Sequence, residues 1–125
     1  MLQNNNAVIV ESDEWTALAL QARDDQVALE TLLKKVRPHI ASYIRSRGRI
    51  SGEDVEDVVQ QVCIRIAKHI GNYDSNRGAF MAWMKVIAAR ILMNHNRDRR
   101  RRARKLEEYK IRLDANHHGS VRKVL

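Results

Sequence analysis

Apolar residues recur at intervals of three and four along most of the chain, which is the spacing that places them on one face of an α-helix. The clearest stripe follows Ser51, where Ser51–Asp54 form a capping box that predicts the start of a long helix. Gly71 is the expected end of this helix. Its apolar positions fit a 3.6-residue period and are Val55, Val58, Val59, Val62, Cys63, Ile66 and Ile70. Because no segment of useful length alternates with a period of two, the pattern predicts an all-α fold, a small bundle of about five helices.

Three shorter helices are predicted before this one. Ser12 or Asp13 can cap a first helix that ends near Arg23, and Asp24 can cap a second. Pro38 suits the first turn of a third helix, which ends near Gly48. The apolar residues expected on the inner faces are Trp15, Leu18, Ala19, Val27, Leu29, Leu32, Leu33, Val36, Ile40, Tyr43 and Ile44.

A polar turn, residues 72–78, separates the long helix from a last helix that begins at Ala79 and runs into an arginine tract at residues 97–105. Its expected buried stripe is Phe80, Met84, Ile87, Ala88 and Ile91, with Trp83 at the edge. From about Asp114 the composition predicts an irregular tail. The predicted organisation is a disordered segment at residues 1–11, a helical domain at residues 12–105 and a basic tail at residues 106–125.

Charge is distributed unevenly. The chain has a formal net charge of +8, yet residues 1–84 contain 10 basic and 11 acidic side chains. Residues 85–125 contain 13 basic and four acidic side chains, so the whole excess lies in the last third. Arginine forks match phosphate oxygens, so this third favours nucleic acid as a partner; a solvated helix face is the alternative.

Two helix faces are not explained by the core. Opposite its apolar stripe, the long helix presents polar side chains around Ile64, which suits the centre of a protein-binding face or an isolated exposed residue. The last helix presents Lys85 and Arg90 among small and apolar residues, close to Tyr73, Phe80 and Trp83. Rings beside a basic helix suit stacking on unpaired bases; the alternative is that Phe80 and Trp83 fill the core.

Several classes of function are disfavoured by what the sequence lacks. The single cysteine, Cys63, excludes an internal disulfide framework and fits a reducing cytoplasm. No apolar run approaches the roughly 18 residues of a membrane-spanning helix. There is no glycine-rich phosphate loop and no evident carboxylate pair, and the adjacent His117 and His118 point in different directions. We therefore expect neither an enzyme nor a cofactor or metal site.

Three segments resemble the second conserved region of the sigma-70 family, and its extracytoplasmic-function (ECF) branch most of all. They are residues 54–62 (DVEDVVQQV), residues 70–83 (IGNYDSNRGAFMAW), and Asn94 and His95 before the arginine tract. The similarity covers about residues 12–105. It implies a helical domain that docks on the β′ clamp helices of core RNA polymerase and opens the promoter at the −10 element, in the cytoplasm at the nucleoid.

The resemblance also implies roles for individual residues. The polymerase-binding residues would be Glu53, Asp57, Gln60, Gln61 and Ile64. The residues at the flipped base, along the non-template strand and at upstream phosphates would be Tyr73, Asn76, Arg77, Phe80, Trp83, Lys85, Arg90, Asn94, Arg97, Arg99, Arg100 and Arg101. An anti-sigma factor is a further expected partner.

The chain departs from the family pattern in three respects. Gln61 stands where the family usually has an acid, and Arg90 where it usually has an asparagine. The family's helix-turn-helix domain, which reads the −35 element, does not fit in the 20 residues after Lys105. We therefore expect half of a split sigma factor, a factor that takes its −35 reader from a second protein, or a truncated chain. The alternatives are a polymerase-binding regulator that does not read promoters and a non-specific nucleic-acid-binding protein.

Overall fold

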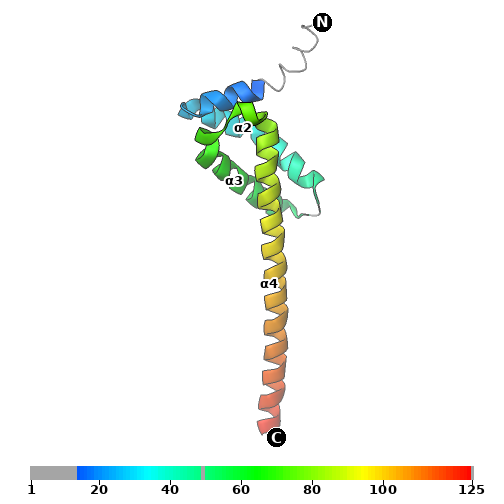
Figure 1. The fold of residues 1–125 in the computed structure, drawn as a ribbon. Helices are drawn as coiled ribbons and strands as arrows, with labels where there is room; N and C mark the ends of the chain where they lie inside the picture. Colours follow the sequence, from blue (N-terminus) through cyan, green and yellow to red (C-terminus); the bar gives the residue numbers. More distant parts are fainter. Residues whose placement is uncertain (1–13, 49, 125) are drawn as a thin grey trace. The chain divides into compact units, whose positions relative to one another are not determined.

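The described part of the chain is built from helices joined by turns (Figure 1). The computed structural model describes residues 14–48 and 50–124, and the side chains of residues 14–48 and 50–116. A helical segment at residues 14–22 is followed by α2 (Gln26–Ser46), α3 (Gly52–His69), two short 3₁₀ turns (Ile70–Asn72 and Ser75–Arg77) and α4 (Phe80–Val124). The all-α prediction is confirmed, with four helices in the described ranges rather than about five. The chain divides within α4 into two units, Met1–Leu92 and Met93–Leu125.

The predicted second and third helices are one helix, α2, and Pro38 lies inside it. A proline in a helix interior costs about 3 kcal/mol, because it removes a hydrogen bond and crowds the preceding turn. The buried stripe nevertheless crosses the proline without a change of register, and two of its members, Ile40 and Ile44, lie beyond it. Burying each contributes about 1.5–3 kcal/mol, which outweighs that cost. The stripe consists of Ala28, Leu32, Val36, Ile40 and Ile44.

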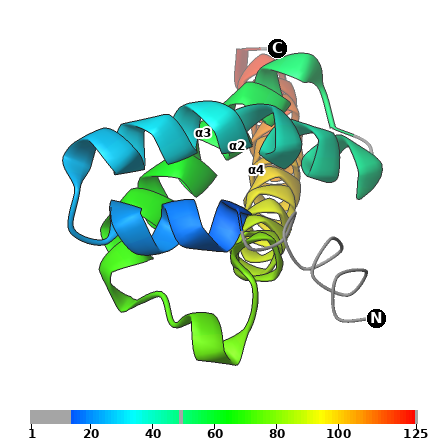
Figure 2. The same ribbon diagram turned by 90° about the horizontal axis from the view of Figure 1, so that it is seen from above.

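The start of α2 also differs from the prediction. Asp25, not Asp24, is the N-cap, and its Oδ1 accepts hydrogen bonds from the backbone N–H groups of Val27 (2.9 Å) and Ala28 (3.4 Å). Val27, predicted in the core, is 69% exposed, because the inner face of the helix begins at Ala28. The helical segment 14–22 and α2 are joined by a short turn and lie side by side (Figure 2). The caps predicted at Ser12 and Asp13, and the segment 1–11, lie outside the described residues.

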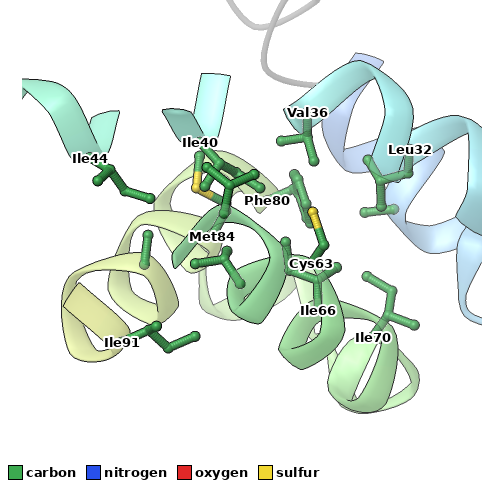
Figure 3. Close-up of a cluster of buried hydrophobic side chains, with 14 of the residues drawn as sticks. Leu32, Val36, Ile40, Ile44, Cys63, Ile66, Ile70, Phe80, Met84 and Ile91 are labelled. Atoms are coloured by element: carbon green, nitrogen blue, oxygen red, sulfur yellow. The ribbon is translucent and has the colours of Figure 1, made fainter. Parts of the chain in front are cut away.

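Helix α3 matches its prediction closely. Ser51 is the N-cap, and its Oγ accepts a hydrogen bond from the backbone N–H of Asp54 at 3.2 Å. All seven residues of the predicted stripe are buried. The α-helix ends at His69, and Gly71 falls in the 3₁₀ turn that follows. Helix α3 packs on α2, and the side chains of both helices converge with Phe80, Met84 and Ile91 of α4 in one apolar core (Figure 3).

The first turns of α4 complete this core. The backbone N–H of Phe80 donates to Thr16 Oγ1 at 3.2 Å, which ties the start of α4 to the helical segment 14–22. Phe80, Met84 and Ala88 are fully buried. Ile87 is only partly buried, and the buried Leu92 was not predicted. Helix α4 continues to Val124, through the segment from Asp114 where the sequence predicted an irregular tail.

Candidate nucleic-acid and protein interfaces

The turn between α3 and α4 is held in one conformation by short-range hydrogen bonds. The Tyr73 hydroxyl donates to the Gly78 carbonyl oxygen at 2.8 Å, which joins the two ends of the turn. Asp74 Oδ1 accepts from the backbone N–H of Asn76 at 3.0 Å and caps the second 3₁₀ turn. Gly78 has φ 156° and ψ 164°, a region of backbone conformation that side-chain-bearing residues rarely adopt. The backbone path of the turn is therefore defined by these contacts.

A cluster of aromatic rings supports this turn from the core side. The ring centroids of Tyr73 and Trp83 are 5.2 Å apart, and those of Phe80 and Trp83 are 5.8 Å apart. Trp15 stacks on Phe80 at 6.4 Å. The predicted clustering of Tyr73, Phe80 and Trp83 is thus confirmed.

The roles predicted for two of these rings need correction. Tyr73 and Phe80 were placed at the DNA, but both side chains are buried in the core. The reason is tertiary packing, since Tyr73 lies edge-on to Phe80 at 6.0 Å and Phe80 is covered by Trp15. Phe80 does not line the surface hollow beside the turn, whereas the buried Tyr73 contributes to the wall of that hollow. Trp83 is only partly buried and keeps an accessible edge, as predicted.

That edge of Trp83 lines a surface hollow of about 220 Å³ beside the turn. The hollow is smaller than the roughly 300–1,000 Å³ of sites for drug-sized ligands, and so suits a single planar ring system. Its walls are largely apolar and carry one cation, the exposed Arg77, whose Nε lies 3.9 Å from Asp74 Oδ2. The lining residues are Tyr73, Asp74, Arg77, Gly78, Ala82, Trp83 and Val86.

Helix α4 presents the predicted basic face next to this hollow. Lys85 and Arg90 are exposed, and neither forms an ion pair with any residue that the structure describes. Lys85 Nζ lies 5.9 Å from the centroid of the Tyr43 ring, and Arg47 Cζ lies 5.3 Å from the same ring. Cations without carboxylate partners keep their full charge for a polyanion.

The second unit carries the arginine tract. Every side chain from Arg97 to Asn116 is exposed. Arg97 donates a hydrogen bond to Asn94 Oδ1 at 2.7 Å, so the side chains of these two predicted DNA-binding residues are in contact. Arg97, Arg100 and Arg104 line one groove around the small side chain of Ala103. Arg99 and Arg101 are exposed as well.

The predicted polymerase-binding face of α3 is open to solvent. Ile64 is 50% exposed and is surrounded by polar neighbours. The other predicted members, all exposed, are Glu53, Asp57, Gln60 and Gln61. A second hollow, of about 330 Å³, lies at the C-terminal end of this face and is lined by Gln61, Ile64, Arg65, Lys68, His69 and Ile91.

The sequence prediction missed some members of both surfaces. Ala82 and Val86 lie four residues apart in α4, and this spacing is the signal that places both on one side of the hollow. Arg65 and His69 are likewise four residues apart and complete the second hollow. Val86 is one of the apolar residues predicted beside Lys85 and Arg90 on the outward face of the last helix, whereas Ala82, Arg65 and His69 were assigned to neither surface.

Neither a reactive thiol nor a metal centre emerges from the described residues. Burial raises the pKa of the Cys63 thiol, and the nearby Arg37 guanidinium only partly offsets this, so the group stays a protonated core residue. No three His, Cys, Asp or Glu side chains in the described ranges lie together as a metal site would require. Residues 117 and 118, the histidine pair, lie outside the described side chains. None of the described helices combines the length and the apolar character needed to cross a bilayer.

Comparisons with known proteins give one family and one curated relative. Residues 32–102 match the sigma-70 region 2 family. The chain is 33% identical over 93 residues to the ECF RNA polymerase sigma factor SigE of Mycolicibacterium smegmatis, a match that covers 72% of this chain. It covers 35% of that protein, so the chain spans about a third of its relative's length. No solved structure matches the chain significantly.

Proposed function

The chain belongs to the sigma-70 region 2 family, in its extracytoplasmic-function branch, and we propose on this basis that it is a sigma-like transcription initiation factor. In this proposal it binds core RNA polymerase and recognises and melts the promoter −10 element. One observation carries the proposal beyond family membership. A ring-sized hollow with an aromatic wall lies directly beside a basic helix face without carboxylate partners.

The hollow accounts for melting in energetic terms. Taking a base out of a duplex costs a few kcal/mol. Stacking of a base on an aromatic side chain returns about 1–3 kcal/mol, and Trp83 is the partly exposed ring that lines the hollow. Arg77, which lines the hollow, would hold the phosphate of the flipped nucleotide. Tyr73 and Phe80 would contribute indirectly, because their rings pack against Trp83 and hold it and the turn in place.

The remaining DNA contacts follow from charge. Lys85, Arg90 and Asn94 would follow the non-template strand along α4, while Asn76 stands at the turn. Contacts of this kind position a strand but carry little sequence information. Arg97, Arg99, Arg100 and Arg101 would hold upstream phosphates. Sequence preference therefore depends on the hollow rather than on the tract.

The DNA test compares two tryptophans of one core. The chain, bound to core RNA polymerase, is titrated with a labelled −10-type single strand and with the matching duplex. Trp83→Ala should weaken single-strand binding by about 5–150-fold, the equivalent of about 1–3 kcal/mol, and affect the duplex less. Trp15→Ala is the matched control, because Trp15 also contacts Phe80 but does not line the hollow. Equal losses in the two variants would contradict a stacking role for the hollow.

The exposed face of α3 supports the polymerase-binding half of the proposal. A protein-binding surface usually has an apolar centre and a polar rim. On α3 the half-exposed Ile64 is such an apolar centre, and polar side chains surround it. The test is a pull-down of core RNA polymerase with the wild-type chain and with Asp57→Ala/Ile64→Ala. The double variant should lose polymerase binding. Glu56→Ala is the control and should retain it, because Glu56 is turned by about 100° around α3 from Asp57 and so lies away from the predicted binding face. A wild-type chain that leaves core polymerase unbound would refute the proposal.

A second candidate function, a polymerase-binding regulator that does not read promoters, is favoured by the α3 face taken alone. Such a regulator would bind polymerase and tolerate Trp83→Ala. Control by an anti-sigma factor and action in the cytoplasm at the nucleoid are further parts of the proposal, supported by family membership.

A further inference from the structure

On the C-terminal side of the arginine tract, helix α4 carries an apolar stripe. No described residue covers this stripe. Leu106, Tyr109 and Leu113 are 49–59% exposed. Their intervals of three and four residues place them within an arc of about 60°, because each residue turns an α-helix by about 100°. These three residues are called the α4 seam below.

An uncovered seam is unusual on a helix of this kind. Most of the stability of a helix in a protein comes from packing its apolar face, rather than from intrinsic propensity. All side chains of α4 from Arg97 to Asn116 are exposed, so this stretch packs no face of its own. The seam groups three of the four large exposed apolar residues on the described part of this stretch, so covering it would bury the most apolar surface and stabilise the helix.

Charge along the edges of the seam indicates what would cover it. Lys105, Lys110 and Arg112 flank it, each turned by about 40–60° from the nearest seam residue. The acidic residues of this stretch, Glu107, Glu108 and Asp114, are turned away by about 80° or more. Both edges of the seam are thus basic, and none of these cations has an ion-pair partner among the described residues.

The basic edges of the seam argue against a second copy of this helix and against a membrane surface as its binding partner. In a paired copy of the same helix the flanking cations would face each other, and like charges at these positions disfavour pairing. A membrane surface suits a wide apolar face opposite a charged one, whereas this seam is narrow and its cations adjoin it.

We propose that the α4 seam docks an acidic amphipathic helix of another protein. The partner would place apolar side chains between Leu106, Tyr109 and Leu113 and carboxylates opposite Lys105, Lys110 and Arg112. The seam spans eight residues, a length of about 12 Å, so the contact covers about two turns. This proposal is independent of promoter recognition, because it uses none of the residues assigned to DNA.

The test uses the full chain and designed peptides of three heptads, followed by fluorescence anisotropy. One peptide has leucine at the a and d positions and glutamate at e and g; a second has lysine at e and g; a third keeps the glutamates but has serine at a and d. The chain should bind only the first. The third peptide isolates simple attraction to the arginine tract, which the proposal expects to be weak.

Variants of the chain sharpen the result. Leu106→Ala/Leu113→Ala should weaken binding at least about tenfold, and alanine preserves the helix, which far-UV circular dichroism verifies. Ile111→Ala is the matched control, since Ile111 is 61% exposed but lies on the other side of α4. Replacing Lys105, Lys110 and Arg112 by glutamate should transfer binding to the lysine peptide.

Several outcomes would overturn the proposal. They include failure to bind the leucine–glutamate peptide, equal binding of the serine–glutamate peptide, equal losses in the seam and Ile111 variants, and a chain that dimerises through the seam in size-exclusion chromatography. Binding of the seam to vesicles of anionic phospholipid in preference to the peptide would assign it to a membrane instead.

Discussion

Replacing Gly78 by alanine tests the geometry of the turn that forms the hollow. The backbone of Gly78 has φ 156° and ψ 164°, which costs a residue with a side chain about 1–3 kcal/mol. A Cβ added at this position would meet no atom within 4 Å. In the folded state, the effect of the substitution is therefore backbone strain, without a steric contribution.

Gly71→Ala provides the matched control. Gly71 lies in the preceding 3₁₀ turn, has no positive φ, and would also accept a Cβ without contact. Alanine lowers the entropy of the unfolded chain at both sites and stabilises each by about 0.4–1 kcal/mol. Because this gain is common to both variants, their difference in free energy of unfolding isolates the strain. We expect Gly78→Ala to be less stable than Gly71→Ala by about 1–3 kcal/mol.

Urea denaturation followed by tryptophan fluorescence measures this difference. At about 1.4 kcal/mol per factor of ten, the unfolding equilibria of the two variants should differ by about 5–150-fold. If the turn instead relaxes to relieve the strain, the hydrogen bond from Tyr73 to Gly78 opens, and single-strand binding by the polymerase complex falls in Gly78→Ala only. Equal stability together with equal DNA affinity in the two variants would refute the argument.

Three further predictions concern stability. Asp25→Ala should lower the free energy of unfolding by about 1 kcal/mol, because it removes the N-cap of α2, whereas Asp24→Ala should have little effect; denaturation curves that coincide would show that the cap is unimportant. Pro38→Ala should raise the melting temperature, since alanine restores a hydrogen bond in the interior of α2 and gains up to about 3 kcal/mol; calorimetry that shows no rise would mean that the helix ends at Pro38 in solution. Because burial raises the folded-state pKa of Cys63, the folded protein holds this proton more tightly than the unfolded chain; the contribution of Cys63 to stability should be constant below the ordinary thiol pKa of 9.0 and fall as pH rises above it. Cys63→Ala should lack this component, and identical pH profiles for the two proteins would contradict it.

Periodicity predicted the interior of α3 and of the first turns of α4 well, because one face of each of these helical stretches meets the core. All seven residues of the α3 stripe are buried, and its Ser51 cap forms. Boundaries were harder. Asp24 and Asp25 are equally good caps in sequence, and only the register of the buried face, which begins at Ala28, selects Asp25. In the sequence alone, Pro38 indicates the start of a helix. Only the burial of Ile40 and Ile44 beyond it shows that one helix continues through the proline.

The candidate site was predicted as a set of residues but not as a geometry. The sequence placed three rings near the turn, yet periodicity cannot determine which ring faces outward. Contacts that are distant in sequence settle it: Thr16 and Trp15 hold Phe80 from the helical segment 14–22. The hollow likewise depends on the hydrogen bond from Tyr73 to Gly78, which no sequence pattern signals.

This geometry changes how ring substitutions are to be interpreted. Phe80 is fully buried, so Phe80→Ala removes core packing worth about 3–5 kcal/mol. The total stability of a small domain is about 5–15 kcal/mol, so that variant would lose DNA binding by loosening the fold, whatever the ring does for a base. Trp83 combines partial burial with an accessible edge in the hollow. It is therefore the aromatic position of the turn at which DNA binding and folding can be separated, provided that stability is measured beside affinity in the same variant.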